Sequence, residues 1–154
     1  MALDEDGDFG FGNVMDHLQA ALTKFVAEGF VASAEHARMA IPTVGRSRAD
    51  LLAPFAATGR FAGLEVAQLD TIPGADPIWD AFEASGDVNA LARSQAAFTR
   101  AFASPTLAAA LDGTSDGRAA AFGDRLEAEL VKRFAAAPVR MPSTLGRVHL
   151  VKAV

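Results

Sequence analysis

The stretch GRFAGLEVAQLDTIPG, residues 59–74, decides the class of fold because it contains the two-residue period of a β-strand. The strand is predicted over residues 61–69, with Leu64 and Val66 on one face and Glu65 on the other. The Ile72-Pro73-Gly74 turn then ends it. A second short strand is predicted at the end of the chain, over residues 147–151.

Helices are predicted over most of the remaining sequence. Val14, Leu18, Leu22 and Phe25 form the apolar stripe of an amphipathic helix. Asn13 is expected to cap this helix and Gly29 to end it. The longest late helix is predicted from Ser115 to Ala137, with the apolar spacing Phe122, Leu126, Leu130 and Phe134.

Shorter helices are predicted from capping and breaking residues. Ser47 and Asp50 form a capping-box pattern. The helices are expected from Ser47 to about Gly59, from Pro77 to Gly86, through Leu91 and Phe102, and from Ser104-Pro105 to Asp112. The result is a mostly helical α+β chain, with a helical cap region at 75–112.

The two predicted strands are too few to form a stable sheet by themselves. Two strands alone cannot bury a core in water. Each strand is therefore expected to be the edge of a larger sheet whose other strands lie outside these residues. This mismatch suggests that residues 1–154 are a fragment.

Composition excludes several classes of function. The 154 residues are 51% hydrophobic and 21% charged, which is typical of a soluble globular domain. The net charge of −5 argues against nucleic-acid binding, and no apolar run is long enough for a membrane span. The chain has no cysteine, and its histidines lack metal-ligand spacing. With its acidic N-terminus, the chain is expected to be cytoplasmic.

Few residues stand out as candidates for a site. Gly7, Gly10 and Gly12 lie in an acidic leader, residues 1–12, and a solvated turn is favoured over a phosphate loop because the acidic residues would repel a phosphate. His17 is expected to be a partly buried, hydrogen-bonded histidine rather than a ligand. Trp79 fits either a core or an apolar pocket. Neither G-x-S-x-G nor a P-loop motif is present, so no catalytic residue is predicted.

Several segments, taken in order, resemble one enzyme family. They are ALTKFVAEGFV (21–31), Ile41-Pro42, Ser47 with Asp50, and Gly59-Arg60-Phe61, with Arg147 to Lys152 resembling the closing strand. This order is similar to that of the salicylate, benzoate and theobromine (SABATH) carboxyl methyltransferases, nearest in style to the bacterial members. The likeness is strongest over residues 18–66.

The resemblance implies the C-terminal half of a Rossmann-like methyltransferase, namely the helical cap and the last two antiparallel strands. The S-adenosylmethionine site of the family lies upstream, so the chain alone is expected to bind no cofactor and to be inactive. The implied partners are a small aromatic or aliphatic carboxylic acid, and either an N-terminal methyltransferase half or a second copy of the chain.

The resemblance also places a few site residues. Counting back from Glu28-Gly29, the substrate-pocket positions are Val14 and Met15, where Met15 replaces the family's tryptophan. Trp79 is a further pocket candidate, by its location in the cap. Some plant members have a magnesium site at positions that are Ala37, Met39 and Ala40 here, so that site is predicted to be absent. The alternative function is a non-catalytic, ligand- or protein-binding helical domain.

Overall fold

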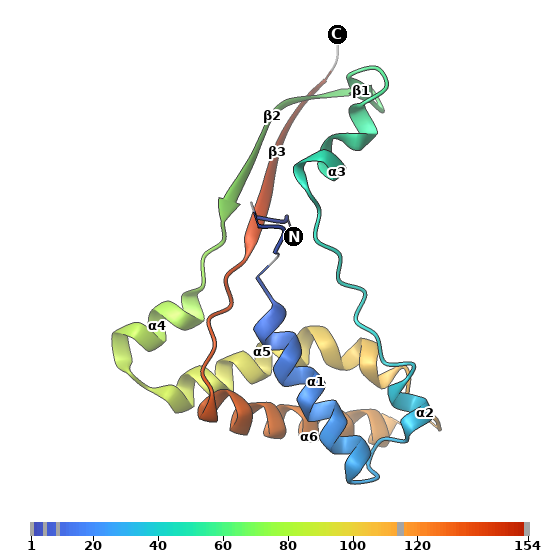
Figure 1. Ribbon diagram of the computed structural model, residues 1–154, viewed down its shortest axis with the longest axis vertical. Coiled ribbons are helices and arrows are strands. Elements are labelled where there is room, and N and C mark those ends of the chain that lie inside the picture. Colours follow the sequence, from blue (N-terminus) through green and yellow to red (C-terminus); the bar gives the residue numbers. More distant parts are fainter. Residues whose placement is uncertain (1, 5, 9, 114–115, 153–154) are drawn as a thin grey trace. The chain divides into compact units, whose positions relative to one another are not determined.

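A computed structural model gives the structure of the chain (Figure 1). It describes residues 2–4, 6–8, 10–113 and 116–152. The chain divides into two compact units: residues 1–11, 43–76 and 141–154 form the sheet unit, and residues 12–42 and 77–140 form the helical unit. Each unit is built from segments that are distant in the sequence.

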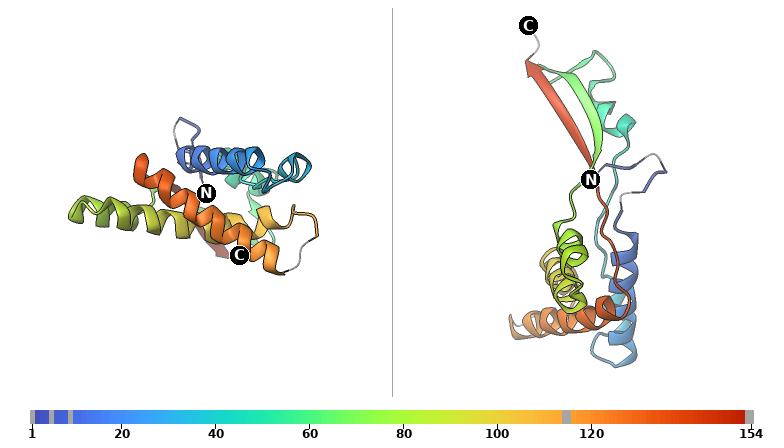
Figure 2. Two further views of the ribbon diagram at one scale, coloured as in Figure 1. Left: turned by 90° about the horizontal axis from the view of Figure 1, so that it is seen from below. Right: turned by 90° about the vertical axis from the view of Figure 1, so that its left-hand side faces the viewer.

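The helical unit contains the long helices that the apolar patterns predict. Its helices are α1 (Gly12–Ala27), α2 (Ser33–His36), α4 (Pro77–Ser85), α5 (Val88–Ala108) and α6 (Asp116–Ala136). Helix α6 packs against both α1 and α5 (Figure 2, left). The region 75–112 thus forms α4 and α5.

The core of the helical unit is the stripe of α6. Phe122, Leu126, Leu130 and Phe134 are fully buried, as their spacing predicts. Burial of such a side chain stabilises the folded state by about 1.5–3 kcal/mol. The facing stripe of α1 is also buried, and the Lys24 ammonium donates to the Glu129 carboxylate of α6 over 2.6 Å.

Two predicted helix boundaries in this unit are wrong. Helix α1 begins at Gly12, so Asn13 lies in its first turn and not at the cap. Helix α5 continues through Pro105, where a new helix was expected. Proline removes one backbone hydrogen bond there, but Ala103 and Leu107 on either side are buried, and this packing favours continuation of the helix.

The sheet unit has three antiparallel strands in the order β1-β2-β3. They are β1 (Arg60–Phe61), β2 (Leu64–Pro73) and β3 (Thr144–Lys152). The predicted antiparallel pairing of the two long strands is confirmed, with Leu69 opposite Val148 and a register shift between Val66 and Gln68. Both strands are longer than predicted.

The prediction of one continuous strand over residues 61–69 is wrong. Phe61 pairs with Leu64 across a two-residue turn, so this segment is a tight hairpin. Ala62 and Gly63 have φ angles of 49° and 75°. Two central residues with positive φ are typical of a type I′ turn, whose twist matches that of the flanking strands.

Short helical segments connect to the strands of the sheet unit. Helix α3 (Arg48–Leu52) is followed by the 3-10 turn η1 (Ala53–Phe55). The Ser47–Asp50 capping box is present: the Asp50 amide donates to Ser47 Oγ, and the Ser47 amide donates to Asp50 Oδ2. Arg48 donates to the carbonyl of Leu69 in β2 over 2.6 Å, which ties α3 to the strand.

Part of the acidic leader also belongs to the sheet unit. The Ala2 amide donates to the carbonyl of Thr144 at the start of β3, and Ala2 is buried. Asp4 Oδ1 accepts from the amides of Asp6 and Asp8, which makes the acidic stretch a turn. In the ranges covered by the structure, no helix is long and apolar enough to cross a membrane.

Candidate functional site

A cavity of about 250 Å³ opens in the helical unit beside α1. Its lining is mostly apolar and comes from three parts of the chain: Met15, Asp16, Leu18, Gln19 and Leu22 of α1, Met39 and Ile41 after α2, and Leu107 of α5. An apolar cavity with a few polar groups is the usual form of a small-molecule site. Its volume suits a molecule of about one ring, since cavities near 150 Å³ already accept benzene.

The polar group best placed to meet a ligand is the Gln19 amide. Gln19 Nε2 lies 3.3 Å from His36 Nε2. An amide nitrogen carries two hydrogens, so one is left for an acceptor on a ligand after the contact with His36. The Asp16 carboxylate lies on the same lining and disfavours a negative group beside it.

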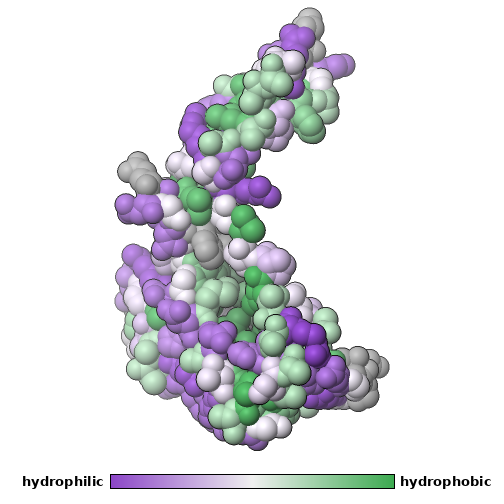
Figure 3. Space-filling model, turned by 45° about the vertical axis from the view of Figure 1, so that its right-hand side comes forward, coloured by the Kyte–Doolittle hydropathy of each residue, from purple (hydrophilic) through white to green (hydrophobic). Residues whose placement is uncertain are grey.

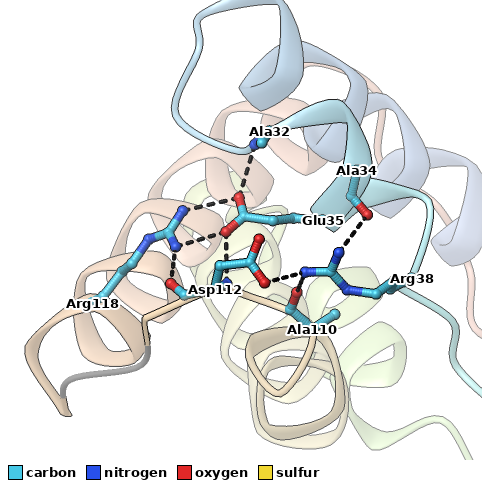
Figure 4. A network of polar contacts seen from close by, with 7 residues as sticks. All are labelled: Ala32, Ala34, Glu35, Arg38, Ala110, Asp112 and Arg118. Carbon is cyan, nitrogen blue, oxygen red and sulfur yellow. Dashed lines mark hydrogen bonds and ion pairs between the residues drawn. The ribbon is translucent and has the colours of Figure 1, made fainter.

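The segment that precedes the lining residue Met39 is anchored by a buried carboxylate, Glu35 of α2, which is 1% exposed (Figure 4). It accepts hydrogen bonds from the amides of Ala32 and Asp112 at 2.8 and 2.7 Å. The Arg118 guanidinium pairs with both carboxylate oxygens at 2.6 and 2.9 Å. The contact with Arg118 is the main reason that the pKa of Glu35 falls to about 2, and the two amides add to it against the opposing effect of burial.

Arg38 forms a second, exposed set of contacts next to Glu35. Its guanidinium donates to the carbonyls of Ala34 and Ala110 and to the carboxylate of Asp112, at 3.1, 2.8 and 2.6 Å. Arg118 also donates to the Asp112 carbonyl. The turn after α2 is therefore tied to the connection between α5 and α6.

The three residues expected to contact a substrate do not lie together. Met15 lines the cavity. Val14, its neighbour in sequence, is fully buried in the core between the helices. Trp79 lies on α4, where its indole N–H donates to Glu83 at 2.7 Å and its ring packs edge-on against Phe82.

A second cavity is lined by residues of α4 and α5, among them Ile78, the residue before Trp79. It has a volume of about 230 Å³, and its apolar lining includes Ile78, Phe82 and Leu91, whereas Trp79 is not part of the lining. Its polar lining residues are Ser85, Asp87 and Ser94, and neither cavity has a cationic side chain in its lining. The cavity beside α1 is preferred because its lining includes Met15, a position that the resemblance singles out.

His17 is the partly buried, hydrogen-bonded histidine that its position predicts. Its ring packs on Phe134 with centroids 4.9 Å apart, and it bonds to the backbone of Ala137. Burial, followed by the nearby Arg133, lowers its pKa despite the opposing effects of Asp16 and Ala137. It does not line the cavity beside α1.

One of the three leader glycines, Gly10, lies against the chain's own backbone. At Gly10, with φ of 88°, a Cβ atom would lie 1.8 Å from the carbonyl oxygen of Pro142. The space that a side chain would fill at Gly10 is thus taken by the chain's own backbone. The Asp8 carboxylate accepts the Gly10 amide at 2.8 Å, so this donor is already used.

The positions of the plant magnesium site carry no carboxylate. Ala37, Met39 and Ala40 follow α2, and Met39 lines the cavity as an apolar residue. In the part of the chain that the structure covers, no three His, Asp or Glu side chains are grouped closely enough to hold a metal ion. The donor set at this place does not fit a divalent cation.

Sequence reasoning missed most of the cavity wall. Met39 and Ile41 were singled out only for a metal position and for the Ile41-Pro42 segment, and Leu107, more than sixty positions away, carries no signal at all. A local signal existed only for α1, where Leu18 and Leu22 belong to the apolar stripe. Comparison with known proteins adds nothing to this picture: no protein-family profile matches the sequence, and no curated protein is significantly similar to it.

Proposed function

We propose that this chain is the substrate-cap half of an S-adenosylmethionine-dependent carboxyl methyltransferase of the SABATH type. The observation that supports this most is the cavity beside α1. It brings Met15, a position that the resemblance places in the substrate pocket, together with Ile41 of the Ile41-Pro42 segment that carries the resemblance. The acceptor is a small aromatic or aliphatic carboxylic acid of about one ring, and the setting is cytoplasmic.

The sheet gives a second, weaker line of support. Strands β2 and β3 are antiparallel neighbours, as the last two strands of such a Rossmann-like fold would be. The cofactor site and the parallel strands of that fold would come from an N-terminal half, so this chain is inactive alone. That half, or a second copy of this chain, is its protein partner.

Methyl transfer to a carboxylic acid requires no catalytic side chain from this half of the enzyme. A carboxylate is already a nucleophile, so no general base is needed. Positioning of the acid and exclusion of water are the contributions that an apolar cap can make. Leu18, Leu22 and Leu107 would contact the apolar body of the acid. The Gln19 amide would meet its carboxylate, although Asp16, three residues earlier on the same helix, also lies on the lining.

The alternative is a non-catalytic domain that binds a ligand or a protein. One observation favours it: the sheet unit exposes apolar side chains (Figure 3). The large ones include Phe61, Leu145 and Leu150. Scattered apolar residues are common on protein surfaces. The choice between the two functions therefore depends on methyl transfer.

Calorimetry with benzoate tests the cavity. A fragment-sized ligand is expected to bind in the millimolar range, a free energy of about −4 kcal/mol. Met15→Glu places a second carboxylate in the lining and should abolish binding. Leu145→Glu, a matched change on the exposed face of β3, should leave binding unchanged. Benzoate binding that survives Met15→Glu contradicts the proposed site.

An assay of methyl transfer distinguishes the methyltransferase half from the non-catalytic binding domain. The chain alone should give no heat with S-adenosylmethionine and no methyl benzoate. Mixed with the cofactor-binding half of a SABATH enzyme, it should transfer labelled methyl to benzoate, and the Met15→Glu variant should not. Micromolar binding of S-adenosylmethionine by this chain alone would overturn the proposal, while benzoate binding without transfer would favour the non-catalytic domain.

A further inference from the structure

One arginine links two of the chain segments that line the cavity beside α1. Arg38 directly precedes Met39, which lines one wall. Its Nη2 group donates to the carbonyl of Ala110 at 2.8 Å (Figure 4). The Ala110 amide in turn donates to the carbonyl of Leu107, the residue of the other wall, at 3.1 Å.

The contacts of Arg38 hold the segment that carries Met39 at a fixed distance from the end of α5. The guanidinium is planar and donates in a rigid fork, and here it engages Ala34, Ala110 and Asp112 at once. The carbonyl of Ala110 lies just beyond the C-terminus of α5, where a cation is favoured. A side chain held at three points fixes the peptide on which Met39 is carried.

Arg38 belongs to a more exposed ion pair than Arg118 does. The side chains of Arg118 and its partner Glu35 are 33% and 2% exposed, whereas those of Arg38 and Asp112 are 47% and 73% exposed. An exposed ion pair contributes little to the free energy of unfolding. Removal of Arg38 is therefore expected to leave the fold intact, in contrast to removal of Glu35 or Arg118.

We infer that Arg38 is a positioning residue that sets the spacing between Met39 and Leu107, and with it the size of ligand that the cavity accepts. This inference rests on the proposed function for the identity of the ligand, a small carboxylic acid. Arg38 touches no ligand itself. It acts through the wall residue that follows it.

The first test needs no ligand. In protein labelled with ¹³C at the methionine methyls, Arg38→Ala should shift the Met39 resonance and leave that of Met141, in the sheet unit, unchanged. Arg38→Lys, which keeps one charged donor, should give a smaller shift. Arg93→Ala, an exposed arginine of α5, is the matched control and should shift neither. A Met39 resonance unmoved by Arg38→Ala overturns the inference.

The second test measures selectivity with benzoate and the larger 2-naphthoate. If only about a fifth of the Arg38→Ala molecules have the spacing between Met39 and Leu107 that binds benzoate, the affinity of this variant for benzoate falls about fivefold. Naphthoate should lose less affinity, so the ratio of the two affinities changes, while Arg38→Lys stays closer to wild type. An unchanged ratio contradicts the inference. If the wild-type chain binds neither acid, the proposed function fails, and the Met39 resonance still decides the role of Arg38.

Discussion

The buried carboxylate of Glu35 accepts hydrogen bonds from two backbone amides and from Arg118. Its pKa is lowered from 4.5 to about 2, mainly by Arg118. The folded state therefore binds the proton more weakly than the unfolded state. Its stabilising contribution is complete above pH 4.5 and is lost as the pH falls toward 2.

The lowered pKa of Glu35 leads to a prediction for Glu35→Gln, which keeps the shape of the side chain and removes the charge. The variant should melt well below wild type at pH 7, because Arg118 is left without its anionic partner. The difference in Tm should stay constant down to about pH 5 and then shrink toward pH 2.5. Thermal melting across this range checks it, and a difference that is unchanged at pH 2.5 would contradict the role given to the charge.

Gly10 is the residue where the backbone leaves no room for a side chain. Gly7 and Gly10 both have a positive φ, but only Gly10 faces another part of the chain, the Pro142 carbonyl. Gly7→Ala should cost about 1–2 kcal/mol from the left-handed backbone alone. Gly10→Ala should cost clearly more, because Pro142 must also move. Urea unfolding of both variants measures the difference, and equal costs would show that the contact with Pro142 is unimportant.

The β1–β2 hairpin is the element where local sequence and structure agree least. Ala62 adopts a φ of 49°, a conformation in which alanine is disfavoured and asparagine is common. Ala62→Asn should therefore stabilise the hairpin by up to about 1 kcal/mol. Hydrogen exchange of the Leu64 amide should slow in this variant. Ala62→Val, with a β-branched side chain, should speed exchange, and slower exchange in both would argue against the turn geometry.

The same turn explains which elements sequence could predict. The stripes of α1 and α6 recur over several turns, and the helices appear where these patterns place them. The turn at Ala62-Gly63 lacks the Asn-Gly or Asp-Gly signal of such hairpins, so β1 and β2 were merged. Pro105 is a strong local signal for a new helix, but the buried packing around it decides otherwise.

The site was less predictable than the helices because its parts meet only in the folded chain. Met15 was found through its distance from Glu28-Gly29, a local relation. Glu35 and Arg118 are 83 residues apart, and their contact has no signature in the sequence. Leu107 reaches the cavity only because α5 continues through Pro105.

At the scale of the whole molecule, the surface of the sheet unit favours association. Leu150 and Val151 on β3 are 40% and 39% exposed, and β3 ends the strand order of the sheet. An open edge of this kind can pair with another chain. We expect association that increases with concentration, seen by light scattering. Leu150→Lys should reduce it, since a lysine on an edge strand opposes pairing. A wild-type monomer at all concentrations would exclude this edge as an interface.

The proposed function of the whole molecule requires one cavity in the helical unit that receives a small carboxylic acid, with the cofactor bound elsewhere. Three of the four methionines report on it directly: Met15 and Met39 line the cavity, and Met141 belongs to the sheet unit. The decisive measurement is a titration of methyl-labelled protein with benzoate and then with S-adenosylmethionine. Benzoate should shift Met15 and Met39 in a saturable way and leave Met141 in place, and S-adenosylmethionine should shift none of the three. Saturable shifts with S-adenosylmethionine, or no response of Met15 and Met39 to benzoate, would contradict it.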